Sequence, residues 1–94
     1  MYIYTQVQFV KRKDHSDVII YYSKNGEKFR RSTGVRVLPK NITSKGAISL
    51  SHPNHEEDSK KIKSLQDRIE DIVISYKDKY GEKPSVEWLE KQFD

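Results

Sequence analysis

The sequence predicts an α+β fold in which a three-stranded antiparallel sheet packs against a long amphipathic helix, followed by a short second helix. In the first third of the chain, apolar and polar residues alternate, which is the period of half-buried strands. From about residue 54, apolar residues recur at spacings of three and four, which is the period of a helix. With 94 residues the chain has the size of one small domain. We expect the sheet in residues 1–38, a loop in 39–53 and helices in 54–94.

The first strand is expected over residues 2–10, which are rich in aromatic and β-branched residues. Because successive side chains of a strand point to opposite faces, the alternation predicts two sides. The side expected to be buried holds Ile3, Val7 and Phe9. The other side is expected to hold Tyr2, Tyr4, Gln6 and Gln8.

The second and third strands are expected over residues 18–23 and 27–33, joined by the dipeptide Asn25-Gly26. This dipeptide is a strong hairpin signal, because both central residues of a type I′ turn need positive φ. A two-residue turn there pairs Ser23 with Lys28, Tyr22 with Phe29, Tyr21 with Arg30, and Ile20 with Arg31. The face away from the core is then expected to carry Tyr21, Ser23, Lys28 and Arg30.

Two positions on the other side of this hairpin matter for the core. Phe29 lies between Lys28 and Arg30 and is therefore expected to point inward. Arg31 falls on the same apolar side, which fits a position at the edge of the sheet where its aliphatic stem covers the core.

The segment after the hairpin is punctuated by glycine and proline at four positions, which are Gly34, Pro39, Gly46 and Pro53. Glycine and proline at this frequency predict a loop, with short extended pieces over residues 35–38 and 47–50.

The long helix is expected to begin near Asn54 or Ser59, either of which can cap it, and to end before Gly81. Its apolar stripe, which we assign to the core, consists of Ile62, Leu65, Ile69, Ile72, Val73, Tyr76 and Tyr80. After Pro84 a second helix is expected over residues 86–93, with Ser85 as its cap and Trp88 as a packing residue.

The net charge of +4 is unevenly distributed. Residues 1–50 hold ten Lys or Arg against three Asp or Glu, whereas residues 51–94 hold eight against eleven. A basic half of this kind favours a polyanionic partner. A solvated basic surface without a partner accounts for the charge equally well.

Several function classes are disfavoured by composition. The chain has no cysteine, which excludes disulfides and thiolate zinc sites and fits a cytoplasmic protein. No stretch approaches the apolar length of a membrane span, so we expect no membrane partner. His52 and His55 are interrupted by Pro53, so we expect neither a metal nor another cofactor there. No catalytic motif has a plausible structural setting, and we expect no enzymatic activity.

The hairpin is followed by Ser32-Thr33-Gly34 and then by Val35-Arg36-Val37-Leu38-Pro39, ahead of the long helix. This order and spacing resembles the amino-terminal region of tyrosine-recombinase integrases of Bacteroides-type mobile elements, over nearly the whole chain. The family usually has Trp-Asp shortly after that proline, whereas this chain has Ile42-Thr43.

The resemblance implies a function in DNA integration and recombination. In that family the module is a three-stranded sheet backed by a helix, and it recognises arm-type DNA sites by laying the sheet in the major groove. Catalysis belongs to a separate carboxy-terminal domain. The resemblance therefore implies that this chain is non-catalytic, that core-binding and catalytic domains follow residue 94, and that other recombinase subunits are partners of the full-length protein.

The residues themselves also favour duplex DNA as the partner. Arg30 can address guanine, Gln6 and Gln8 can address adenine, and basic residues near the turns can meet phosphates. The expected DNA-binding residues are Gln6, Gln8, Lys11, Arg12, Lys13, Tyr21, Ser23, Lys24, Lys28, Arg30 and Arg36. Two alternatives stay open, an RNA-binding β-sheet module and a basic protein-interaction domain that docks on an acidic partner.

Overall fold

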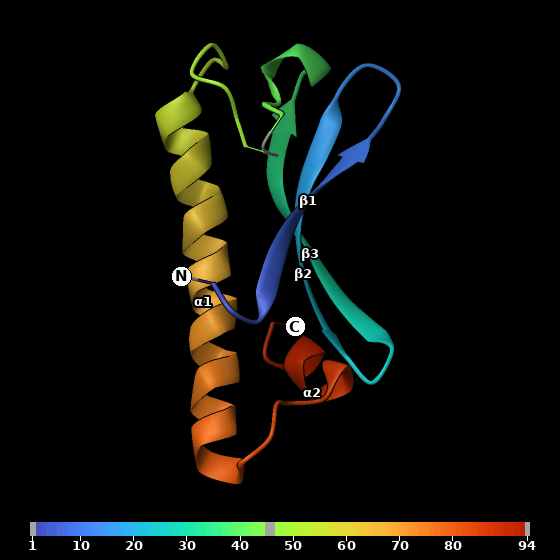
Figure 1. Cartoon of the computed structure of the whole chain (residues 1–94), viewed down its shortest axis with the longest axis vertical. Coiled ribbons are helices and arrows are strands. Elements are labelled where there is room, and N and C mark those ends of the chain that lie inside the picture. The colour runs from blue at the N-terminus through green and yellow to red at the C-terminus, as the bar shows by residue number, and fades with distance from the viewer. Residues whose placement is uncertain (1, 45–46, 94) are drawn as a thin grey trace.

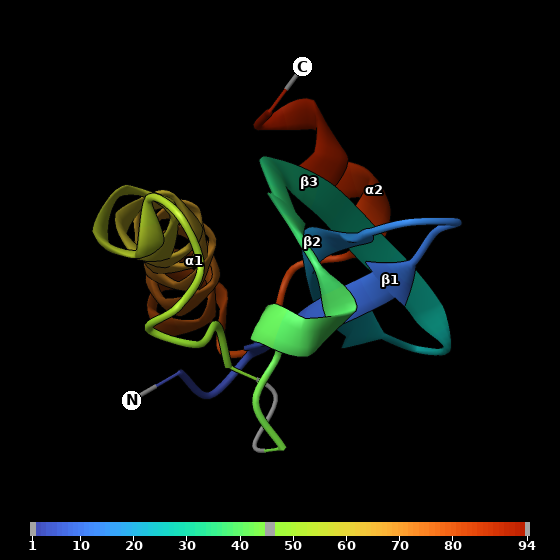
Figure 2. The same ribbon diagram turned by 90° about the horizontal axis from the view of Figure 1, so that it is seen from above.

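The computed structural model describes residues 2–44 and 47–93, and it confirms the predicted α+β fold (Figure 1). Three antiparallel strands form one sheet in chain order, so the first and third strands are its edges. The elements are β1 (Thr5–Lys11), β2 (Ser16–Lys24), β3 (Glu27–Val37), a 3-10 helix η1 (Pro39–Asn41), α1 (His55–Tyr80) and α2 (Val86–Lys91). Helix α1 runs alongside the sheet, and α2 lies near the β2–β3 turn (Figure 1). The view from above shows α1 standing on one side of the sheet (Figure 2).

The β2–β3 hairpin has the predicted register. Asn25 and Gly26 both have positive φ, 53° and 81°, as the two-residue turn requires. The pairs Ser23 with Lys28, Tyr22 with Phe29, Tyr21 with Arg30 and Ile20 with Arg31 are all present. Arg31 lies on the edge strand with its guanidinium over the rings of Phe29 and Phe93, at 5.4 and 5.5 Å from their centroids. The expected edge position for Arg31 is therefore confirmed.

Strand β3 continues past Thr33 to Val37, farther than predicted. The register shifts at an irregularity opposite Val18, and pairing with β2 then resumes at Arg36 and Val37. The Thr33 hydroxyl donates to the Val18 carbonyl at 2.8 Å and accepts from the Val35 N–H at 3.1 Å. Gly34 has a φ of 78°, which glycine adopts without strain. Of the separate extended piece expected over residues 35–38, residues 35–37 therefore belong to the third strand, and Leu38 lies just beyond it.

The core lies between the inner face of the sheet and the two helices. Its main cluster consists of Ile20, Tyr22, Phe29, Ile69, Val73, Val86 and Leu89. A smaller cluster at the other end of the sheet consists of Val18, Val35 and Val37. The predicted helix stripe is confirmed at its centre, where Ile69 and Val73 are fully buried, but Tyr80 in the last turn is 58% exposed.

The amino-terminal segment departs from the prediction. Strand β1 begins at Thr5, Ile3 is 71% exposed, and Tyr4 packs against the main core cluster and not beside Gln6. The cause is Glu70 of α1, whose carboxylate accepts hydrogen bonds from the backbone N–H groups of Ile3, Tyr4 and Thr5. These bonds direct the segment toward the helix and away from the ladder.

The loop after β3 is tied down by a few contacts. It opens with η1, and Ile42 forms an isolated bridge with Ile48 and packs against the smaller core cluster. Ile42 therefore anchors the loop. Gly46 lies outside the described residues.

The helix ends follow the sequence signals with two differences. Helix α1 starts after Asn54, which has a φ of 62° and makes no side-chain capping bond. Gly81 ends it, and the Gly81 N–H donates to the Lys77 carbonyl. The Ser85 hydroxyl accepts from the Trp88 N–H at the start of α2, which ends at Lys91, two residues before the expected end.

Candidate nucleic-acid interface

The face of the sheet turned away from α1, here called the outer face, is mostly polar. The alternate residues between its members, such as Ile20, Tyr22 and Phe29, are buried in the core. By register, the outer face consists of Gln6, Gln8 and Val10 of β1, Asp17, Ile19, Tyr21 and Ser23 of β2, and Lys28, Arg30, Ser32 and Arg36 of β3. Six of the eleven residues expected to bind DNA therefore lie in the central part of the outer face. A seventh, Arg36, lies on the same face nearer the β1–β2 loop.

Cross-strand pairing arranges these side chains in rows. Gln6, Tyr21 and Arg30 lie directly across from one another, and Gln8, Ile19 and Ser32 form the next row. The Tyr21 hydroxyl donates to Gln6 Oε1 at 2.5 Å, and Lys28 Nζ lies 5.3 Å from the centroid of the Tyr21 ring. Tyr21 therefore fixes the positions of a side chain on each flanking strand.

The cations in the centre of the outer face are not neutralised. Lys28 and Arg30 are exposed and two residues apart on β3, so they project from the same side. Within the described part of the chain, no carboxylate lies at ion-pair distance from either of them. Their donors are thus available to a ligand.

At the other end of the outer face, Asp17 gathers three cationic or titratable partners. Its carboxylate lies 2.9 Å from Arg12 Nε, 4.0 Å from Arg36 Nε and 3.2 Å from His15 Nε2. The hydrogen bond from Arg12 lowers the pKa of Asp17, which keeps the carboxylate charged. Arg12 and Arg36 therefore share one negative charge, and this end of the face is less positive than the sequence suggests.

Three of the four predicted lysines are not on the outer face. Lys24 and Lys11 share their side with the inward-facing residues of β2 and β1, and the Lys24 ammonium donates to the Lys83 carbonyl oxygen. Lys13 is exposed in the β1–β2 loop, beyond the strands. The structure therefore groups Lys24 with the β2–β3 turn.

Lys83 was not expected from the sequence. Its ammonium donates to the Ser23 carbonyl at 3.5 Å, and with Lys24 and Lys28 it lines a hollow of about 440 Å³ beside the Asn25-Gly26 turn. No local signal points to Lys83, because it lies 59 and 60 positions away in sequence from Lys24 and Ser23, the residues of β2 that it contacts. Three ammonium groups at one end of the hairpin form a second concentration of positive charge.

His52 joins the loop to the start of α1. His52 Nε2 lies 2.7 Å from Asp58 Oδ2, which ties the loop to the first turn of α1. Among the described residues there is no group of three or more His, Asp or Glu that could hold a metal ion. No helix in that part of the chain is both long and apolar enough to cross a membrane.

Comparisons with protein-family models, with curated proteins and with solved structures find no match to this chain.

Proposed function

We propose that this chain binds duplex DNA through the outer face, with a preference for particular sequences, as the non-catalytic amino-terminal module of a tyrosine recombinase. The observation that carries the proposal is the row formed by Gln6, Tyr21 and Arg30, with Lys28 beside it. This row presents amide, hydroxyl and cationic groups together on one exposed side of a packed sheet. The recombinase context rests on the sequence resemblance.

The dimensions of the sheet suit the major groove. Neighbouring strands are about 4.8 Å apart, so the outer strands of a three-stranded sheet lie about 10 Å from each other. The major groove of B-DNA is about 12 Å wide. A sheet of this width enters the groove with its side chains toward the base edges and its two edge strands toward the phosphate walls.

The chemistry of the outer face suits base recognition. An arginine donates two parallel hydrogen bonds to O6 and N7 of guanine, which is the role we assign to Arg30. A glutamine side chain pairs with N6 and N7 of adenine, a role available to Gln8, whereas the Oε1 of Gln6 accepts from Tyr21. Lys28 and the cations near the turns are assigned to phosphates.

The same face is less suited to single-stranded RNA. Binding of unstacked bases uses exposed aromatic rings as platforms. Among the described residues, Tyr21 is the aromatic on the outer face, and its ring is covered by Lys28 while its hydroxyl is bound to Gln6. This arrangement favours hydrogen bonding over stacking.

A titration by fluorescence anisotropy tests the proposal. We expect the chain to bind duplex DNA, with a log-log salt slope of about −0.9 for each phosphate contacted. Selection from a random duplex pool is expected to enrich a short motif. Undetectable binding at low salt, or affinity that does not change with salt, would contradict the proposal.

Two competitors separate the alternative functions. Single-stranded RNA that binds more tightly than duplex DNA would indicate an RNA-binding module. A polyglutamate peptide that binds as tightly as duplex DNA, with no motif enriched, would indicate a domain for acidic protein partners.

A further inference from the structure

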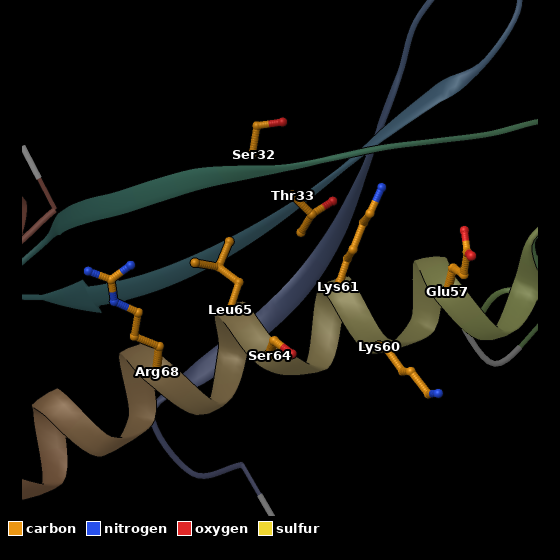
Figure 3. Close-up of a pocket in the computed structure, with 8 residues that line it drawn as sticks. All are labelled: Ser32, Thr33, Glu57, Lys60, Lys61, Ser64, Leu65 and Arg68. Atoms are coloured by element: carbon orange, nitrogen blue, oxygen red, sulfur yellow. The ribbon is translucent and has the colours of Figure 1, made fainter.

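A groove of about 680 Å³ lies between the free edge of β3 and helix α1 (Figure 3). Its lining combines cations and hydroxyls around one apolar side chain, and includes Ser32, Lys60, Lys61, Ser64, Leu65 and Arg68. The groove has one acidic residue in its lining, Glu57, against three basic ones. Its charge therefore favours an anionic ligand.

Two of the cations are directed at the strand. Figure 3 shows Lys61 reaching from α1 toward β3, Arg68 rising toward the sheet on the other side of Leu65, and Lys60 pointing away from β3. Lys61 and Arg68 are seven residues apart, which is two helical turns, so they lie on the same side of α1 and about 10 Å apart along its axis. Within the described residues, neither forms an ion pair with a carboxylate.

Arg68 is held in place by an aromatic ring. Its guanidinium lies 4.7 Å from the centroid of Phe93, and Phe93 packs against Phe29 of the core at 5.4 Å. A stacked guanidinium keeps its edge donors available for a phosphate and loses little side-chain freedom on binding. The groove thus contains one pre-positioned cation and one flexible cation.

Ser32 connects the groove to the outer face. It lies opposite Ile19 in the ladder, and Figure 3 shows its side chain on the side of β3 away from α1. Its Oγ accepts from the Gly34 N–H at 3.1 Å, which leaves the hydroxyl hydrogen able to donate outward. A ligand on the outer face that passes over the edge of β3 at Ser32 therefore reaches Lys61 and Arg68.

We infer that this groove receives the sugar-phosphate backbone of the same duplex whose base edges meet the outer face. Lys61 and Arg68 bind phosphates of one strand, and the Ser32 hydroxyl donates to a phosphate at the edge of β3. The inference rests on the proposed function, because the width of the sheet brings its edges against the phosphate walls of the major groove. The contact is independent of base sequence.

The substitutions Lys61→Gln and Arg68→Gln test this assignment in the full 94-residue chain. Each is expected to reduce affinity by a common factor for the selected motif and for unrelated duplexes, and to make the log-log salt slope shallower by about 0.9. Arg68→Lys, which keeps the charge, is expected to keep the slope. Thermal melts check that each variant remains folded.

Lys63→Gln is the matched control. It removes the same charge from the same helix, but Lys63 lines a hollow on the β1 side together with Phe9 and Ile62. We expect its salt slope to equal that of the unsubstituted chain. If the unsubstituted chain fails to bind duplex DNA, the proposed function itself fails.

Three results would overturn the groove assignment while the unsubstituted chain still binds DNA. One is that Lys61→Gln and Arg68→Gln behave as Lys63→Gln does. Another is a loss of sequence preference, which would place these side chains on bases. The third is a loss of polyglutamate binding with DNA binding unchanged, which would make the groove a site for an acidic peptide.

Discussion

Glu70 of α1 holds Thr5 at the start of β1, because the Thr5 N–H and hydroxyl both donate to Glu70 Oε2, at 2.7 and 2.6 Å. The backbone N–H groups of Ile3 and Tyr4 donate to the same carboxylate at 3.0 Å each. Glu70 is only 4% exposed. These donors replace the hydrogen bonds to water that its carboxylate loses on burial. The position of β1, and with it Gln6 on the outer face, therefore depends on α1.

Glu70→Gln should destabilise the fold. The substitution replaces one acceptor oxygen by an NH₂ group, which cannot accept from the backbone and leaves donors unsatisfied, at a cost of about 1–3 kcal/mol. Urea denaturation measures the loss, and amide shifts should change along β1, including Gln6 and Gln8. Glu90→Gln, at an exposed position of α2, is the control and should leave the midpoint unchanged. An unchanged midpoint for Glu70→Gln would contradict a stabilising role for these bonds.

A second prediction concerns alkaline pH and Tyr22. The Tyr22 hydroxyl donates to the Pro84 carbonyl at 2.6 Å, and burial raises the pKa of Tyr22 from 10.0 to about 12. Because the folded-state pKa lies above the unfolded one, the contribution to stability is complete below pH 10 and is lost as the pH rises from 10 to about 12. We expect the free energy of unfolding to decline across that window.

Tyr22→Phe should lower stability at neutral pH by about 1–3 kcal/mol, since the Pro84 carbonyl loses its donor. It should also make the decline between pH 10 and 12 shallower. Part of the decline should remain, because burial also raises the pKa of Tyr2 to about 12. Tyr80→Phe, at a side chain that is 58% exposed, is the control for both effects. Equal slopes in the Tyr22→Phe and unsubstituted chains would contradict the assignment.

The parts of the fold that local signals determine could be predicted from sequence. Asn25-Gly26 fixes the hairpin turn, and the two-residue period of strands then places Lys28 and Arg30 on the face opposite Phe29. The stripe of α1 was predicted for the same reason, because its period is local. The hairpin turn and the two-residue period of strands are sufficient to predict the outer face of β2 and β3.

The features that were missed depend on residues far apart in the chain. The path of residues 2–4 is set by Glu70, more than 65 residues away, and no periodicity in the segment reports that contact. The side of the sheet on which Lys24 lies follows from the alternation of side chains along β2. Its contact with Lys83 cannot be inferred from that alternation. The groove beside β3 requires the relative placement of a strand and a helix, which sequence spacing does not supply.

The last prediction separates the binding face from the core by substituting two adjacent residues. Arg30 is exposed on the outer face, whereas Phe29 is 1% exposed and packs against Phe93. Arg30→Ala should leave the thermal midpoint nearly unchanged and weaken binding to the selected duplex by about 1–3 kcal/mol, with a relaxed preference at one base pair. Phe29→Ala should cost about 3–5 kcal/mol of stability, because it removes a buried ring from a small core.

An amide-shift titration with the selected duplex completes this test. If the outer face binds DNA, Tyr21 and Arg30 should shift strongly in the unsubstituted chain, while Ile69 and Val73 in the buried stripe of α1 should not. With Arg30→Ala, the shift at Tyr21 should need a higher DNA concentration to saturate, since the row loses its cation. Shifts confined to α1, or an Arg30→Ala affinity equal to that of the unsubstituted chain on every duplex, would show that the sheet does not read the bases.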